Sequence, residues 1–362
     1  MRLRFMCQTP CAKGCNYNGF VLAFTVKMNV HVNGISRVFG ATEVLRNFSL
    51  EVFDREFVSL LGPSGVGKTT LLRILAGLDA PDSGSVRFSG RGGAEVSAGG
   101  AAVLVFQDYV LFPFLTIYGN VAFGLQARKL PRAAVAARVA ELLEHFGLAD
   151  QAKQYPTQLS AGQRQRVAIA RALAVEPRVL LLDEPLANLD KNLKRDTALY
   201  LRRVQREFGI TTICVTHDQE EAMAISDRIA VMLDGGVAQF GSPQDVYYRS
   251  VSPSVARFLG PVSELPHDLV EPGGAGHNGG NGNRLFRPEQ LIIIRRRSGR
   301  FVVRDVRLLG PYRLCVLECG GNSYEVFTAY PVQLEQGDSV ELCRPEALAQ
   351  SKDEEGVYDT PV

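Results

Sequence analysis

A glycine-rich turn with a single lysine lies between an apolar run and a helical pattern at residues 60–78, LLGPSGVGKTTLLRILAGL. Its core, Gly62 to Thr69, fits the spacing G-x-x-x-x-G-K-[ST]. Glycine lets a backbone wrap closely with its N–H groups pointing inward, and a helix start adds about half a positive charge. Lys68 can reach the β- and γ-phosphates of a nucleotide, and the Thr69 hydroxyl can ligate Mg²⁺. The stretch therefore predicts a triphosphate-binding site.

Two carboxylates follow the apolar run at residues 179–182. In a parallel sheet the carboxyl ends of the strands carry the ligand. Asp183 at such an edge would hold Mg²⁺, usually through water, and Glu184 would lie closer to the γ-phosphate and orient the attacking water. Strands that end in acids are common, but the glycine-rich turn favours the catalytic interpretation here.

A serine and a glycine precede another helical pattern in the segment Leu159-Ser160-Ala161-Gly162-Gln163. Such residues at a helix N-terminus form an anion site, although any capped helix has them. Because the segment lies far along the chain from Lys68, the sequence predicts two separate phosphate-binding edges. The Asn-Lys-x-Asp pattern of small GTPases does not occur in the sequence, which weakens a GTPase interpretation.

The elements that must position these residues alternate between β-rich runs and helical patterns from about residue 30 to residue 239. We expect strands at residues 57–61, 102–106, 179–182, 212–215 and 229–233, and helices at residues 69–76, 133–146, 161–174 and 191–208. Strands interleaved with helices favour an α/β fold with a mostly parallel sheet covered on both faces.

The pattern changes after residue 241. Residues 271–283, EPGGAGHNGGNGN, contain six glycines and predict a flexible loop or linker. The segments beyond it, such as FVVRDVRLLG and YRLCVLECGG, predict the short strands of a small β-barrel. Six arginines between Arg295 and Arg307 could bind RNA or an anion on an OB-like fold, but we favour a solvated strand face on a dimer-stabilising domain.

Composition excludes several classes of protein. The 40 lysines and arginines nearly balance 38 acidic residues, which gives no electrostatic case for a nucleic-acid binder. No apolar run approaches the roughly 18 residues of a membrane span. The odd count of seven cysteines argues against a disulfide scaffold, and the spacing of Cys7, Cys11 and Cys15 fits no common zinc pattern.

The order of five motifs resembles the nucleotide-binding subunit of an ABC transporter over about residues 30–241: GPSGVGKT, VFQDYVLFPFLT, LSAGQRQRVAIARAL, LLLDEPLANLD and ICVTHDQEEAM. The tail GSPQDVYYRSVSPSVARFLG followed by FRPEQ resembles importer ATPases of the maltose, polyamine, sulfate and ferric-iron group. That group has a C-terminal OB-like (TOBE) domain. The resemblance implies a P-loop ABC ATPase domain at residues 28–245, which includes a helical subdomain, and a regulatory all-β domain at residues 246–362. Residues 1–27 precede the recognisable pattern, and we expect them to form a disordered extension.

The resemblance also implies a role for individual residues. Nucleotide contacts fall on Gly62, Pro63, Ser64, Gly65, Val66, Gly67, Lys68, Thr69 and Thr70 in the Walker A loop, on Ser160, Gly162 and Gln163 in the signature motif, and on Asp190 in the D-loop. Phe39 would stack on adenine, because aromatic rings present a flat face to bases; the alternative is a core or turn residue. Thr69, Gln107 and Asp183 would hold Mg²⁺, and Glu184, His217 and Gln107 would act on the γ-phosphate and the attacking water.

In this family two chains sandwich two ATP molecules, so each γ-phosphate would lie between Lys68 of one chain and Ser160 of the other. The implied partners are a second copy of the chain, polytopic membrane permease subunits and, indirectly, a periplasmic or extracellular solute-binding protein; nucleic acid is not expected. The implied location is peripheral, on the cytoplasmic face of the inner or plasma membrane. Since ATP and ADP bind the open and closed dimers differently, hydrolysis would open the dimer.

Three departures from the family pattern are present: Ala161 replaces a glycine of the signature, Phe114 replaces a more usual polar residue, and residues 1–27 have no counterpart. The tail leans slightly toward ferric iron as the solute, with polyamines, sulfate-like oxyanions, phosphonates and sugars as alternatives. A soluble ABC ATPase acting on ribosomes or DNA, or a non-catalytic scaffold, is a further alternative. The chain has a single ATPase half and no coiled-coil insert, which disfavours a soluble ATPase acting on ribosomes or DNA. The presence of Glu184 and His217 disfavours a non-catalytic scaffold.

Overall fold

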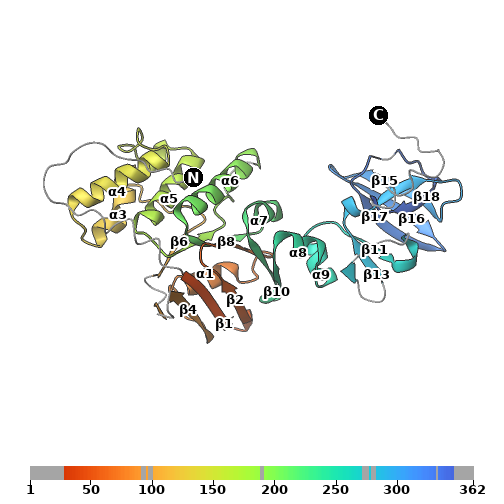
Figure 1. Ribbon diagram of the computed structural model, residues 1–362, viewed down its shortest axis with the longest axis horizontal. Coiled ribbons are helices and arrows are strands. Elements are labelled where there is room, and N and C mark those ends of the chain that lie inside the picture. Colours follow the sequence, from red (N-terminus) through yellow and green to blue (C-terminus); the bar gives the residue numbers. More distant parts are fainter. Residues whose placement is uncertain are drawn as a thin grey trace, which may run out of the picture.

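The computed structural model describes residues 28–90, 95–96, 101–187, 191–270, 277–278, 283–331 and 333–345. Figure 1 shows two lobes, a larger one with the N-terminal strands and most helices, and a smaller β-rich one at the C-terminal side, with two short helices between them. The extension at residues 1–27, its three cysteines, Asp190 and most of the glycine-rich loop lie outside the described residues. The four described cysteines are free thiols.

The central sheet of the larger lobe has the strand order β10-β9-β3-β8-β7-β6. Its members are β3 (Phe57–Leu61), β6 (Ala102–Val105), β7 (Val179–Asp183), β8 (Thr211–Thr216), β9 (Arg228–Leu233) and β10 (Gly236–Gly241). All neighbours pair in parallel except β10 with β9. Every residue of β3, β7 and β8 is buried, which explains their uninterrupted apolar runs. The predicted parallel core is confirmed.

A second, antiparallel sheet was not predicted. It has the order β2-β1-β4-β5, with β1 (Met28–Phe39), β2 (Thr42–Val52), β4 (Ser83–Gly90) and β5 (Glu95–Val96). Along β1, buried side chains alternate with more exposed ones because one face of this sheet packs on the core and the other faces water. Val30, Val32 and Phe48 of this sheet share a buried cluster with Leu71 and Leu75, which lie on the first helix.

Helices cover both faces of the central sheet. They are α1 (Lys68–Leu75), α3 (Ile117–Ala127), α4 (Arg132–His145), α5 (Ala161–Ala174), α6 (Lys191–Phe208) and α7 (Gln219–Ile225), with a 3₁₀ turn at Pro156–Gln158. Leu181 of β7 packs in the cluster with α1, whereas its neighbours Leu180 and Leu182 pack in the cluster with α3, α4 and α5. Because successive side chains of a strand point to opposite faces, α1 and α5 lie on opposite sides of the sheet. Within the described residues, no helix combines the length and apolar character that crossing a membrane requires.

The smaller lobe consists of two antiparallel sheets. One has the order β11-β13-β12 and the other β14-β18-β15-β16-β17. Their strands are β11 (Ser263–Pro266), β12 (His277–Asn278), β13 (Asn283–Phe286), β14 (Ile292–Arg295), β15 (Phe301–Leu308), β16 (Arg313–Cys319), β17 (Asn322–Thr328) and β18 (Ser339–Cys343), with 3₁₀ turns at His267–Leu269 and Pro288–Gln290. Phe286, Phe301 and Val340 belong to a separate buried cluster within this lobe. A small β-region after the ATPase-like fold is therefore confirmed, while the exact domain limits stay predictions.

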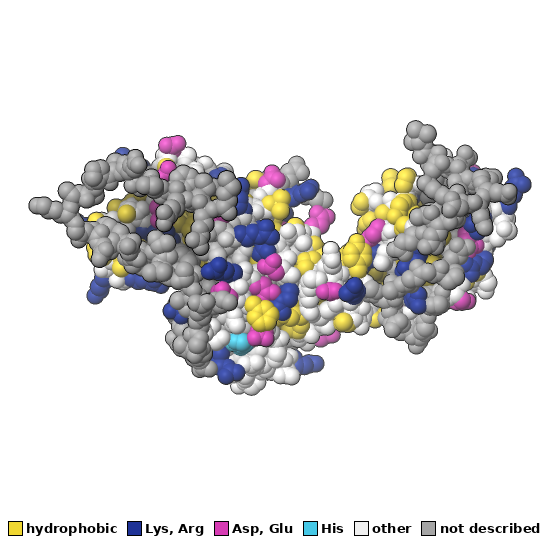
Figure 2. Space-filling model, viewed as in Figure 1, with side chains coloured by type: hydrophobic (Ala, Val, Ile, Leu, Met, Phe, Trp, Pro, Cys, Tyr) yellow, Lys and Arg dark blue, Asp and Glu magenta, His cyan; other side chains and the backbone are white. Residues whose placement is uncertain are grey.

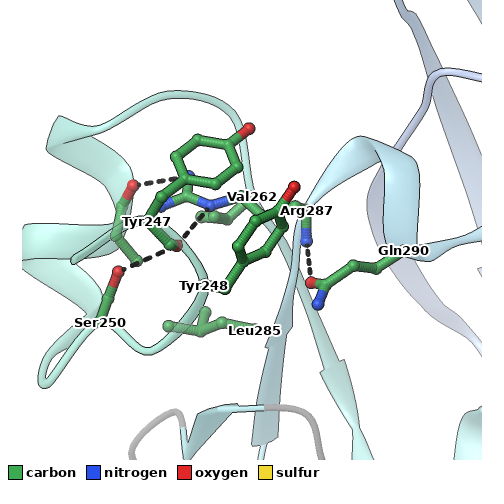
Figure 3. Close-up of a pocket in the computed structure, with 8 residues that line it drawn as sticks. Tyr247, Tyr248, Ser250, Val262, Leu285, Arg287 and Gln290 are labelled. Atoms are coloured by element: carbon green, nitrogen blue, oxygen red, sulfur yellow. Dashed lines mark hydrogen bonds between the residues drawn. The ribbon is translucent and has the colours of Figure 1, made fainter. Parts of the chain in front are cut away.

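Arg287 connects the two short helices between the lobes, α8 (Pro243–Tyr248) and α9 (Pro253–Phe258), to the β-rich lobe. It lies just after β13 and is only 3% exposed. Its guanidinium donates to the carbonyl oxygens of Tyr247 at 3.1 Å, Ala256 at 3.0 Å and Gly260 at 3.3 Å, and lies over the Tyr247 ring. Figure 3 shows Arg287 reaching toward Tyr247 in a small pocket that Gln290 also lines. A cation at the C-terminal end of α9 is favourably placed against the helix dipole.

Replacing Arg287 with leucine should lower the free energy of unfolding by about 2–4 kcal/mol, because several buried carbonyl oxygens lose their donor. Chemical denaturation of the two proteins measures this difference. Arg249→Leu is the matched control, since this side chain is 78% exposed and pairs with Asp245 one turn away; we expect a change within about 0.5 kcal/mol. Equal losses for both variants would show that Arg287 does not hold the helices to the β-lobe.

Candidate active site

The glycine-rich turn connects β3 to α1, as the sequence predicts. Gly65 and Gly67 have φ angles of 82° and 101°, which residues with a Cβ rarely adopt. A Cβ on Gly62 would lie 2.6 Å from the carbonyl oxygen of Met232, and one on Gly67 would lie 2.7 Å from that of Val44. Since Gly67 occupies the N-cap position and has no side chain, it leaves the first N–H groups of α1 available to a ligand.

Lys68 is buried at the first position of α1. Its ammonium group donates to the carbonyl oxygens of Gly62 at 2.7 Å and Pro63 at 2.8 Å. Burial lowers the pKa of Lys68, while the nearby carboxylates of Glu184 and Asp183 act in the opposite direction. An ammonium group that has lost water and is held by neutral carbonyl groups gains strongly from an approaching anion.

Asp183 ends β7 and lies beside the start of α1. The Thr69 hydroxyl donates to its Oδ1 at 3.1 Å. Burial raises the pKa of Asp183, and the Thr69 hydrogen bond counteracts this. The Asp183 carboxylate and the Thr69 hydroxyl are adjacent oxygen donors, and Mg²⁺ is a hard cation that prefers oxygen ligands. The residues therefore fit a magnesium ion bound together with phosphate.

Glu184 and His217 come together because β7 and β8 are parallel neighbours. The pairing of Asp183 with Val215 places the residues that follow both strands at one edge. The backbone N–H of Glu184 donates to Val215 at 3.0 Å, and Nδ1 of His217 lies 3.1 Å from Oε2 of Glu184. Two groups that can orient water or contact phosphate thus lie close to the strand end that carries Asp183.

Gln107 and Phe39 are the more peripheral members of the predicted site. Gln107 is exposed and follows β6, the neighbour of β7. Two residues later, the buried Tyr109 hydroxyl donates to the carbonyl oxygen of Pro185 at 2.9 Å, which connects this loop to the residue after Glu184. Phe39 ends β1 with 48% of its surface exposed, and the Arg37 guanidinium lies 4.9 Å from its ring centroid. Tyr109 and Arg37 were not predicted, and no motif in the sequence signals their contacts.

Ser160, Gly162 and Gln163 lie at the start of α5, on the opposite side of the sheet from α1. Ser160 and Gln163 form a capping box, in which the Gln163 side chain accepts from the Ser160 N–H at 2.9 Å and the Ser160 hydroxyl accepts from the Gln163 N–H at 3.3 Å. The structure therefore does not bring them to the glycine-rich turn of the same chain. It leaves a serine, a glycine and a helix N-terminus at a second edge.

Comparison with known proteins agrees with this site. Residues 45–187 match the family described as ABC transporter. The chain is 44% identical over 278 residues to the sulfate/thiosulfate import ATP-binding protein CysA of Thermosynechococcus vestitus, covering 76% of this chain and 82% of the relative. It is 40% identical over 315 residues to CysA 1 of Agrobacterium fabrum, covering 83% and 91%.

A solved structure is also similar. The cbiO1 protein of Clostridium perfringens, described as part of the ABC transporter complex cbiONQ, matches with a TM-score of 0.55 and 32% identity. The match covers 60% of this chain and 89% of that one. Together, the mixed α/β fold, the phosphate-binding turn and the extent of these similarities show that the chain belongs to the family of ATP-binding, ATP-hydrolysing subunits of ABC transporters.

Proposed function

We propose that this chain hydrolyses ATP to power the import of sulfate or thiosulfate through a separate membrane permease. One observation carries the choice of solute. The similarity to proteins named for sulfate/thiosulfate import extends over 278 and 315 residues. Matches of this length are too long to end within the ATPase-type region at residues 28–245, so they include part of the C-terminal region. This favours the oxyanion alternative over the ferric iron toward which the tail of the sequence leans.

The nucleotide is bound by the residues of the turn. Lys68 and the backbone N–H groups within residues 62–70, where Pro63 has none, hold the phosphates. Phe39 stacks on adenine on the ring face that Arg37 leaves accessible. Thr69, Asp183 and Gln107 hold Mg²⁺, which neutralises phosphate charge when it is bound. Glu184 orients the attacking water and receives its proton, and His217 contacts the γ-phosphate. The contact between Glu184 and His217 therefore has to open as the water and the phosphate enter between them.

A homodimer completes the site in this proposal. Lys68 and Ser160 lie on helices at opposite sides of the sheet, so a phosphate that contacts both needs a second copy of the chain. Ser160, Gly162 and Gln163 of one copy then cover the nucleotide of the other. Ala161 adds a methyl group at this position, which leaves the capping box intact.

The surface that follows Gln107 is proposed to meet the permease. Phe112 packs against Phe114 and Phe123, with ring centroids 5.9 and 4.5 Å apart. Phe114 is 73% exposed and Phe123 46%. An exposed aromatic cluster is typical of an interaction site. We place the chain at the cytoplasmic face of the membrane through this contact, with the solute-binding protein acting on the opposite side of the permease.

The C-terminal region is proposed to be a TOBE-type regulatory or dimer-stabilising domain. Its arginines are largely neutralised: Arg295 pairs with Asp338, Arg300 with Glu341, Arg304 with Glu318 and Arg307 with Asp305. Figure 2 shows acidic and basic side chains interspersed over the visible face. Paired arginines offer little field to a phosphate backbone, so the solvated strand face is favoured over nucleic-acid binding.

Lys68→Ala should weaken ATP binding by about 100-fold or more, because a charge-assisted contact to two phosphates is lost. Isothermal titration calorimetry measures the affinity directly. Lys153→Ala, which removes an exposed lysine outside the site, is the control and should bind like the parent protein. Near-normal affinity of the Lys68 variant would contradict the assignment.

Glu184→Gln should bind ATP but turn it over about 10²- to 10⁴-fold more slowly, since the amide is a poor base. We expect the variant to accumulate as an ATP-bound dimer in size-exclusion chromatography. Adding Lys68→Ala to the same chain should abolish this dimer, because the bridging nucleotide no longer binds. A variant that stays monomeric with ATP and keeps its turnover would refute the proposed role.

The solute is tested by deleting the gene for this chain in its host. Uptake of radiolabelled sulfate should be lost, and should return with the parent gene but not with a Lys68→Ala copy. Ferric iron and polyamine uptake, measured in the same cells, should not change. If one of these is lost while sulfate uptake persists, the proposed solute is wrong even though the ATPase assignment stands.

A further inference from the structure

A buried carboxylate near the proposed active site has no part in the function described so far. Glu221 lies in the first turn of α7 and is 9% exposed. Burial raises its pKa, and the Thr216 hydroxyl and Lys194 counteract this. Taking a carboxylate out of water is costly unless its oxygens find partners. The partners of Glu221 therefore indicate what it does.

One oxygen of Glu221 fixes the turn that carries His217. The Thr216 hydroxyl donates its only proton to Oε2 of Glu221 at 2.8 Å. With that proton committed, a lone pair of the same hydroxyl accepts from the backbone N–H of Asp218 at 2.9 Å. The residues on both sides of His217 are thus held by one hydroxyl, whose direction Glu221 sets.

The other oxygen of Glu221 faces α6. Nζ of Lys194 lies 3.5 Å from Oε1 of Glu221 and 3.7 Å from Oδ2 of Asp218. Asp218 in turn caps α7 by accepting from the N–H groups of Glu220 and Glu221. Lys194 therefore compensates both carboxylates and anchors the turn to the first turns of α6. The carboxylate is held from two elements and has little freedom to reorient.

The His217 side chain itself has little packing to hold it. It is 51% exposed, and its ring contacts Glu184 at 3.1 Å. A half-exposed imidazole takes its direction from the backbone that carries it. We infer that Glu221 is a positioning residue for His217: through the Thr216 hydroxyl it holds the turn that aims the imidazole at Glu184 and the γ-phosphate. The inference rests on the role of His217 in the proposed function.

The test compares variants that remove the hydrogen bond between Thr216 and Glu221 with variants that retain it. Glu221→Leu removes the acceptor, and Thr216→Val removes the hydroxyl at nearly constant volume. Both should lower kcat for ATP hydrolysis about 10- to 100-fold with KM changed less than about twofold, because the histidine is misplaced while nucleotide binding is kept. Thr216→Ser retains the hydroxyl and should keep most of the parental kcat.

A readout independent of turnover is the NMR signal of His217 in protein with isotope-labelled histidine. The chain has five histidines, so His217→Ala identifies the signal. Glu221→Leu and Thr216→Val should shift it. Thr216→Ser should not, nor should Glu220→Leu, the same change at the exposed neighbouring carboxylate. If Glu221→Leu fails to fold, the comparison of Thr216→Val with Thr216→Ser still tests the inference.

Two negative results have different meanings. If Glu221→Leu and Thr216→Val only lower the melting temperature, and kcat and the His217 signal stay at parental values, Glu221 is merely structural and the inference is overturned. If His217→Ala itself keeps full turnover, the proposed role of the histidine fails instead, and the NMR comparison still tests whether Glu221 positions it.

Discussion

The parallel pairing of β3, β8 and β7 is the constraint on which the rest of this protein depends. Each strand is followed by part of the candidate active site: the glycine-rich turn after β3, Glu184 after β7 and His217 after β8. The pairing of Leu61 with Thr216 and of Asp183 with Val215 brings these strand ends to one edge. Because side chains alternate between faces, a slip of one residue would exchange the two cores of the sheet. The strand register that keeps the two cores buried therefore also brings the candidate active-site residues together.

Burial at this edge removes solvent from two charged groups of the candidate site. Because the charged forms lose solvation there, the pKa of Lys68 is lowered and that of Asp183 is raised. Backbone carbonyl groups and the Thr69 hydroxyl replace only part of the lost water. In the proposed function, a triphosphate and a divalent cation would supply the missing opposite charges, and electrostatic interactions are stronger where water is excluded. The same reasoning applies to Glu221, whose charge is compensated by Lys194 and whose second oxygen is used to orient a turn.

The sheet also separates the two phosphate-contacting segments of the proposed mechanism, the glycine-rich turn before α1 and the serine that caps α5. Leu181 faces the cluster of α1, and Leu180 and Leu182 face the helices that include α5. The phosphate-binding turn and the capped serine of α5 consequently belong to different layers. This separation supports the proposal that nucleotide bridges two copies, since a single copy carries the two halves of the proposed phosphate site in different layers.

Local patterns determined much of this protein from the sequence alone. The glycine-rich turn, the buried strands and the capping box at Ser160 depend on backbone sterics and on residues close in the chain, so their spacing predicted both element type and chemistry. The antiparallel sheet at the N-terminal side, the anchoring of α9 by Arg287 and the connection from Glu221 to Thr216 and Lys194 were decided only by the tertiary structure. Most of these contacts join residues from different elements, and even the short step from Glu221 back to Thr216 depends on how α7 packs. Pairings of this kind follow from strand register and helix packing, which no short stretch of sequence encodes.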